Sequence, residues 1–233
     1  LVDHLESVQG RRLEFDQSRS DDIDCQIAST LVAQLKDEAS AVARYGDVLT
    51  RSPENGVALA ALEQLAVNED TRLDACEYLE ALYGERDDAS LARIYGMQLT
   101  QIENDEERFT IFARLGDLQS TKLKLSVDAF ESYISAFSID PSNPYCRERI
   151  HGLAHELGLL ARLASAFESQ ANSCPDPVTR MELSRYLGRF YGSEVPNPSR
   201  SIHWWGTVLE NDELDSEALL ALDGLYMGSR DWS

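Results

Sequence analysis

Residues 129–141 read Ala-Phe-Glu-Ser-Tyr-Ile-Ser-Ala-Phe-Ser-Ile-Asp-Pro, and the spacing within this stretch indicates the fold. Ala129, Tyr133 and Ala136 stand four and three residues apart, which places them on one face of an α-helix. Pro141 follows five residues later and ends the helix, because it has no backbone N–H to continue the hydrogen-bond ladder. The stretch therefore predicts a helix with a small, an aromatic and a second small residue on one face.

The same steps recur elsewhere in the chain. They are found at Ala41, Tyr45, Val48 and Pro53 and, without the proline, at Ser201, Trp205 and Val208. A separation of 34 residues recurs between Ala41 and Ala75, Tyr133 and Phe167, and Pro141 and Pro175. Segment 45–66 also aligns without a gap with segment 205–226. Such internal similarity is typical of helical repeat arrays, in which each unit buries its apolar face against the next.

These residues resemble the tetratricopeptide-repeat (TPR) family. The stretch Ala129-x3-Tyr133-x2-Ala136-x4-Pro141 matches the second helix of that repeat, while Phe112-x2-Leu115-Gly116 and Leu187-Gly188-x2-Tyr191 match parts of the first. The resemblance covers residues 36–227 and implies an all-α, right-handed superhelix of stacked helix pairs with about 12 helices. Half-a-TPR and Sel1-like arrays, which are also α-solenoids, remain alternatives for the family.

Apolar residues recur at three and four along the chain, so we expect a single array over residues 1–233 with few irregular linkers. The predicted helices are 21–35, 38–51, 56–67, 70–83, 88–102, 105–117, 121–138, 144–157, 159–172, 177–191, 199–210 and 215–227, with one more within 1–17. The middle is irregular, since 54 residues separate Leu79 from Tyr133. Helix 70–83 can be either the first or the second member of a pair. Because the chain begins at Leu1 and its last helix, near Trp232, has no partner, we expect a fragment of a longer protein.

The composition bounds the class of partner. The net charge of −20 disfavours phosphate-rich nucleic acids and suits a basic or mixed protein segment. No apolar stretch approaches the roughly 20 residues of a membrane span. The four cysteines have no metal-type spacing, so we interpret them as reduced core residues, which favours the cytoplasm.

Chemical sites are few. His151 and His155 are four residues apart on one predicted helix, a spacing that can hold a metal, but the sequence offers no obvious third ligand. We therefore expect no metal and no cofactor. The acidic clusters at 21–24, 87–88 and 103–107 are expected to favour helix starts. No phosphate loop or nucleophile motif is present, so we expect no enzyme activity.

The resemblance implies that the first helix of each pair lines a concave groove that holds a peptide. The candidate partner-binding residues on this basis are Tyr145, Glu148, His155, Glu182, Tyr186 and Arg189, together with Trp204. Trp204 can instead pack inside the array, whereas Trp205 is expected in the core. The family's clamp for a C-terminal carboxylate needs lysine and asparagine, and Glu148 and Glu182 argue against that ligand.

The predicted function is therefore a non-catalytic interaction scaffold that binds a protein or peptide. The alternatives are a structural or oligomerisation module that acts through its terminal helices, and a helical regulatory domain of an enzyme. The architecture and the resemblance support this order, because no residue signature identifies a particular partner.

Overall fold

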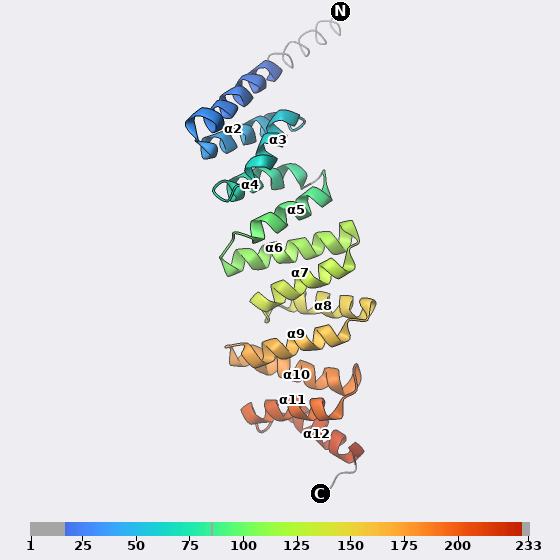
Figure 1. Ribbon diagram of the computed structural model, residues 1–233. Helices are drawn as coiled ribbons and strands as arrows, with labels where there is room; N and C mark the ends of the chain where they lie inside the picture. Colours follow the sequence, from blue (N-terminus) through green and yellow to red (C-terminus); the bar gives the residue numbers. More distant parts are fainter. Residues whose placement is uncertain (1–16, 85, 230–233) are drawn as a thin grey trace, which may run out of the picture. The chain divides into compact units, whose positions relative to one another are not determined.

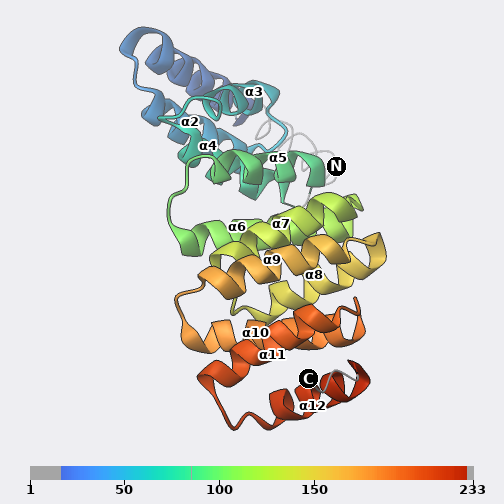
Figure 2. The same ribbon diagram turned by 60° about the horizontal axis from the view of Figure 1, so that its bottom comes forward.

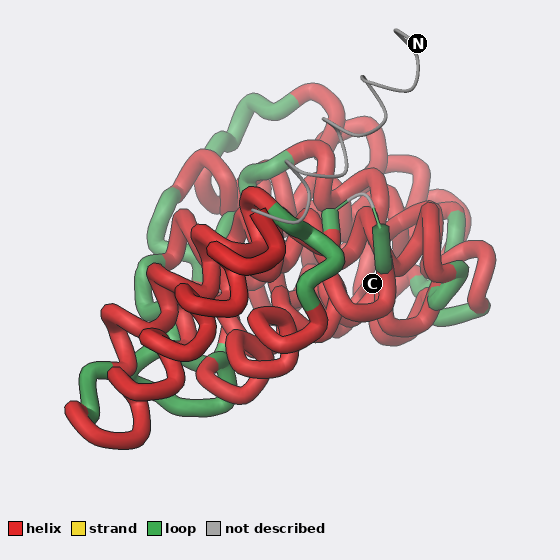
Figure 3. Tube along the Cα trace, turned by 90° about the horizontal axis from the view of Figure 1, so that it is seen from above, coloured by secondary structure: helices red, strands yellow, loops and turns green. Residues whose placement is uncertain are grey.

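The computed structural model describes residues 17–84 and 86–229, and helices joined by short turns make up these ranges, with no strand (Figure 1, Figure 3). This confirms the all-α helical array expected from the sequence. The helix predicted near the N-terminus falls largely outside the described residues, as does Trp232. The chain divides into two compact units, unit 1 (Leu1–Asn104) and unit 2 (Asp105–Ser233).

The described part of unit 1 begins with a helix at 17–30 that tightens into the π-helix η1 (Leu31–Leu35). The helices that follow are α2 (Glu38–Arg51), α3 (Gly56–Leu65), α4 (Arg72–Tyr83) and α5 (Asp88–Leu99). Helix α2 packs against α3 and α4, and α4 packs more extensively against α5 than against α3. Helix α4 is therefore the first member of the α4–α5 pair, which decides between the two interpretations of 70–83.

Unit 2 contains seven α-helices in its described residues. They are α6 (Asp105–Leu118), α7 (Ser126–Ile139), α8 (Pro144–Leu157), α9 (Leu160–Ser173), α10 (Pro177–Ser193), α11 (Pro198–Asn211) and α12 (Ser216–Ser229), with the π-helix η2 (Gln119–Leu123) after α6. Successive helices lie one beside the next (Figure 1, Figure 2). The closest packing joins α6 to α7 and α10 to α11, whereas α8 and α9 approach each other less closely.

Glycine explains the two close pairs. A Cβ atom on Gly116 of α6 would lie 2.8 Å from the Tyr133 ring on α7, and one on Gly188 of α10 would lie 2.6 Å from the Trp205 ring on α11. Each glycine stands 17 residues before its aromatic partner. The equivalent position before Phe167 is the buried Ile150, whose bulk accounts for the wider α8–α9 spacing.

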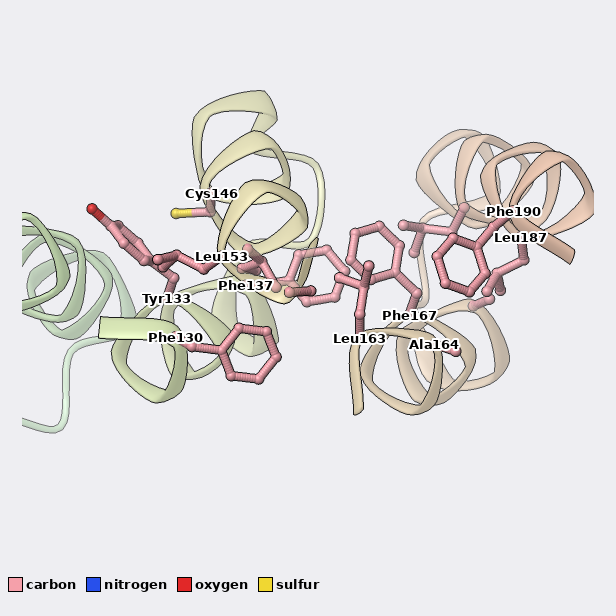
Figure 4. Close-up of a cluster of buried hydrophobic side chains, with 14 of the residues drawn as sticks. Phe130, Tyr133, Phe137, Cys146, Leu153, Leu163, Ala164, Phe167, Leu187 and Phe190 are labelled. Carbon is pink, nitrogen blue, oxygen red and sulfur yellow. The ribbon is translucent and has the colours of Figure 1, made fainter. Parts of the chain in front are cut away.

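The core of unit 2 is aromatic. The Phe137 ring of α7 stacks on Phe167 of α9 at 4.5 Å between centroids, and Phe167 stacks on Tyr186 of α10 at 4.3 Å. Figure 4 shows Phe137 and Phe167 meeting between their helices, with Phe190 beside them. Phe137 and Phe167 are fully buried, so these rings join three successive helices into one apolar core.

Capped turns set the helix boundaries. The side chains of Asn143, Asp176 and Asn197 each accept a hydrogen bond from a backbone N–H in the first turn of α8, α10 and α11. A proline follows each cap at the first helical position, where the absent N–H costs nothing. These turns are the proline-rich breaks of the sequence, and the predicted starts there agree with the structure within one residue.

Two local predictions are wrong. The predicted helix 121–138 begins at Ser126 because α6 continues through η2 and ends at Lys124, which adopts φ 57. Asp21 and Asp24 do not lie at a helix start, since the helix already covers residue 17. They contact Arg51 instead, with shortest N–O distances of 3.2 and 2.6 Å.

Candidate functional site

Polar side chains connect the first helices of the pairs in unit 2. Arg147 of α8 donates a hydrogen bond to the Glu182 carboxylate of α10, with an N–O distance of 3.1 Å. Two ion pairs connect α10 to α12 in the same way, Arg185–Asp215 at 2.6 Å and Arg189–Glu217 at 2.5 Å. Glu182 and Arg189, which the sequence predicted as partner contacts, therefore already hold neighbouring helices together.

The carboxylates on α12 are kept ionised. The pKa of Asp215 is lowered mainly by the backbone N–H of Ala218, which the carboxylate caps at 2.8 Å, and further by Arg185. The pKa of Glu217 is lowered by its hydrogen bonds with Arg189. Both ion pairs are consequently formed at neutral pH, and this surface carries fixed charges of both signs.

Tyr145 on α8 is exposed over 46% of its surface but is not free. Its hydroxyl donates to the Asp117 carboxylate, which also accepts a hydrogen bond from Tyr133 at 2.6 Å. The two tyrosine rings meet edge to face at 6.3 Å. Burial first, and then Asp117, raises the pKa of Tyr145, so the phenol stays protonated as a donor. Tyr145 thus ties α8 to the α6–α7 pair, while Glu148 on the same helix is exposed.

Trp204 and Tyr186 point inward. Trp204 is only 4% exposed and belongs to the aromatic core, which agrees with packing and removes it from the exposed surface. Trp205 is 3% exposed and packs on Gly188, as expected for a core residue. The Tyr186 ring lies between Phe167 and Phe190, and its hydroxyl is buried without a hydrogen-bond partner in the described part of the chain.

His155 and His151 meet a third group that sequence reasoning did not find. The Nε2 atoms of His151 and His155 lie 2.9 and 2.7 Å from Oε2 of Glu194, which caps the C-terminal end of α10. Glu194 is 39 residues beyond His155, so no local pattern joins them. The one available signal is length: 38 residues separate Phe167 from Trp205 instead of 34, and α10 lies within this interval.

A groove of about 570 Å³ lies between α10, α11 and α12. Gly188 and Trp205 contribute to its lining, Leu220 beside it is 75% exposed, and Arg189 and Glu217 line it as a charged pair. Of the predicted partner-binding residues, Arg189 lines this groove. Sequence reasoning missed Glu217 and Leu220, because both lie on α12, for which the sequence gave no contact.

Comparisons with known proteins give structural neighbours only. No protein-family profile and no curated protein sequence matches the chain. The C-terminal part of a TPR repeat-containing protein from Cytophaga hutchinsonii is similar in structure, with a TM-score of 0.37 and 14% sequence identity over 91% of each chain. A thermophilic TPR protein from Thermus thermophilus has a TM-score of 0.33 and 14% identity, over 89% of this chain and 99% of that protein.

The chain has a TPR-like helical repeat fold. Alternating helices joined by short turns, and the contacts of glycine with aromatic rings within helix pairs, define this class. Within the described residues, no helix is both long and apolar enough to span a membrane.

Proposed function

We propose that the chain is a non-catalytic scaffold that binds an extended segment of a protein partner along α8, α10 and α12. The groove between α10 and α12 carries this proposal. It offers about 570 Å³ of open space beside Leu220, which is 75% exposed. A large apolar side chain on a helical surface gains free energy when a partner covers it.

The chemistry of the groove defines the partner. Its apolar lining suits one aliphatic or aromatic side chain of the bound segment, while Arg189 and Glu217 can exchange their ion pair for charges on the partner. The exposed Glu148 and the net charge of −20 favour basic residues beside that apolar side chain. The same charge disfavours nucleic acid. The four cysteines are buried and free, which supports a reducing compartment such as the cytoplasm for this interaction.

Peptide selection tests the proposal. Peptides enriched on the full chain from a random display library are synthesised, and their affinities are measured by fluorescence anisotropy. We expect enriched peptides with an apolar residue beside basic ones. Leu220→Asp should weaken their binding by about 10-fold or more, because a carboxylate in the groove cannot be buried without cost.

Val178→Asp is the matched control. Val178 is 60% exposed near the start of α10 and does not line the groove, so this variant should bind as the wild type does. Equal affinities of the wild type and Leu220→Asp would contradict the proposal, as would a selection without enriched peptides.

A second candidate function is self-association through α12. Several large apolar side chains are exposed on and just before this helix, namely Leu214, Leu219, Leu220, Tyr226 and Met227. Gly206 on α11 aligns with Gly46 of unit 1, which packs on Tyr78, but no atom lies within 4 Å of a Cβ placed on Gly206. Light scattering after size-exclusion chromatography distinguishes the two functions: a concentration-dependent dimer abolished by Tyr226→Asp supports self-association, and a monomer at every concentration excludes it.

A further inference from the structure

His151, His155 and Glu194 form a compact cluster of metal-ligating atoms in unit 2. Their Nε2 and carboxylate oxygen atoms all lie within 4.8 Å of one another. The histidines are one helical turn apart on α8, with ring centroids separated by 4.6 Å. Both Nε2 atoms approach the same oxygen of Glu194, so the two imidazoles and the carboxylate converge on one point.

The backbone on both sides of the cluster is held in place. Ile150 and Ala154, which alternate with the histidines on α8, are fully buried in the core of unit 2. The N–H of Glu194 donates to the Phe190 carbonyl at 2.9 Å and so remains part of the α10 ladder. The Tyr186 ring lies edge-on to His151 at 6.1 Å and limits its rotation. The ligand set is therefore preorganised by two packed helices.

The cluster has the composition and access of a zinc-class site. Two imidazole nitrogens favour a borderline transition metal over Ca²⁺ or Mg²⁺, which prefer oxygen ligands. The side chains of His151, His155 and Glu194 are 35%, 47% and 29% exposed, so an ion and a coordinated water can enter from solvent. The net charge of −20 attracts a cation.

The observed spacing leaves a small adjustment for the metal. The N–O distances of 2.9 and 2.7 Å are hydrogen bonds in which each imidazole donates from Nε2. Around a tetrahedral ion with bonds of about 2.0–2.1 Å, neighbouring ligand atoms lie about 3.3 Å apart. The side chains must then separate by roughly half an ångström, and the Nε2 proton of each neutral ring moves to Nδ1 through solvent. Side-chain rotation suffices for this change.

We propose that His151, His155 and Glu194 bind one divalent transition-metal ion of the zinc class, with water in the fourth position. The ion would join the α8–α9 pair to the end of α10 in place of two hydrogen bonds. This inference stands independently of the proposed peptide groove, which lies between α10 and α12.

Titration of the purified full chain with Zn²⁺ tests the site. Isothermal calorimetry should show saturable binding of one ion, and Co²⁺ in its place should give the visible absorption of a four-coordinate site. His155→Ala should weaken Zn²⁺ binding by about 100-fold or more, since losing even an outer-shell partner of a metal ligand costs about 10- to 100-fold. Glu194→Gln should also weaken binding strongly while retaining a side chain of the same shape, so it serves if His155→Ala does not fold.

Two variants serve as controls. His203→Ala removes an exposed histidine of α11, and Glu156→Gln removes an exposed carboxylate next to His155; both should bind Zn²⁺ as the wild type does. Zn²⁺ should raise the thermal unfolding midpoint of the wild type and both controls but not of Glu194→Gln. Undiminished binding by Glu194→Gln and His155→Ala would overturn the proposal, as would the absence of saturable binding to the wild type.

Discussion

Unit 1 and unit 2 carry the same sequence steps on helices with opposite positions in their pairs. In unit 1 the steps from Ala41 to Pro53 lie on α2, whose partner α3 follows it. In unit 2 the steps from Ala129 to Pro141 lie on α7, whose closest partner α6 precedes it. One helix lies between α2 and α4 and one between α7 and α9, but two lie between α4 and α7. The extra helix accounts for the 54-residue separation and shifts the pattern from first to second helices.

The difference shows that the repeat pattern does not fix a helix's place in a pair. The contact of a glycine with an aromatic ring does. In unit 1 a Cβ on Gly46 would lie 2.4 Å from the Tyr78 ring, which comes from α4 rather than from the partner helix α3. In unit 2 the rings of Tyr133 and Trp205 pack on glycines of their own partner helices. Both unit 2 rings are buried, whereas Tyr78 is half-buried.

The largest contrast is expected from truncating an aromatic side chain in each unit. Phe167→Ala in unit 2 should lower the free energy of unfolding by about 3–5 kcal/mol, because the ring is fully buried between Phe137 and Tyr186. Tyr78→Ala in unit 1 should cost about 1–2 kcal/mol, since half-burial leaves a smaller cavity. Urea denaturation followed by circular dichroism measures both. Equal costs would remove the distinction between the two cores.

Adding one methyl group to each close approach should separate the units further. Gly188→Ala should destabilise by about 1–3 kcal/mol, because the Trp205 ring is enclosed and cannot move away. Gly46→Ala should change stability by less than about 1 kcal/mol, since the half-buried Tyr78 can rotate outward and alanine is the better helix former by about 1 kcal/mol.

The open position Gly206 provides the control for this series. Gly206→Ala should be neutral or stabilising, because no atom lies within 4 Å of the added Cβ. The urea midpoints of the three variants rank them, and a Gly46→Ala variant as unstable as Gly188→Ala would show that the Tyr78 contact is as rigid as that of unit 2.

The smallest effect concerns the polar contact between the first described helix of unit 1 and α2, where unit 2 uses an apolar one between α6 and α7. Burial of Asp21 would raise its pKa, but hydrogen bonds from Ser52, Gln17 and Arg51 outweigh burial and hold the pKa below 3.8. A lowered folded-state pKa stabilises the fold above the unfolded value of 3.8, and this stability is lost as pH falls through the folded pKa.

Asp21→Asn should cost about 1–2 kcal/mol at neutral pH and remove this part of the acid sensitivity. Urea midpoints between about pH 6 and about pH 3 measure it, with the exposed Asp22→Asn as the control. If Asp21→Asn keeps the full wild-type loss of stability in acid, other carboxylates cause it.

The fold was largely predictable because its boundaries are local. Asn143, Asp176 and Asn197 cap helices within three residues of themselves, and the prolines beside them mark the same turns. The break at Lys124 escaped prediction because the run from Gln119 to Leu123 contains neither proline nor glycine.

The candidate site was less predictable, since its contacts join residues far apart in the chain. The sequence placed Arg189 and Glu182 on first helices but could not show that Glu217 and Arg147 already pair with them, at sequence separations of 28 and 35. Glu194 was missed for the same reason. Nothing near His155 indicates which helix end folds back to it.

The lengths of the two irregular separations bear on how such a chain can grow. The interval containing α10 exceeds 34 by four residues, close to the 3.6 residues of one turn, so residues after the addition face nearly the same direction as before. The irregular middle exceeds 34 by twenty, which accommodates a whole helix with its connection. An addition of two residues within a helix would instead turn its apolar face about 200° away from the core. Insertions in this array are therefore tolerated in whole turns or whole helices, and the turn added in α10 is what delivers Glu194 to the histidines.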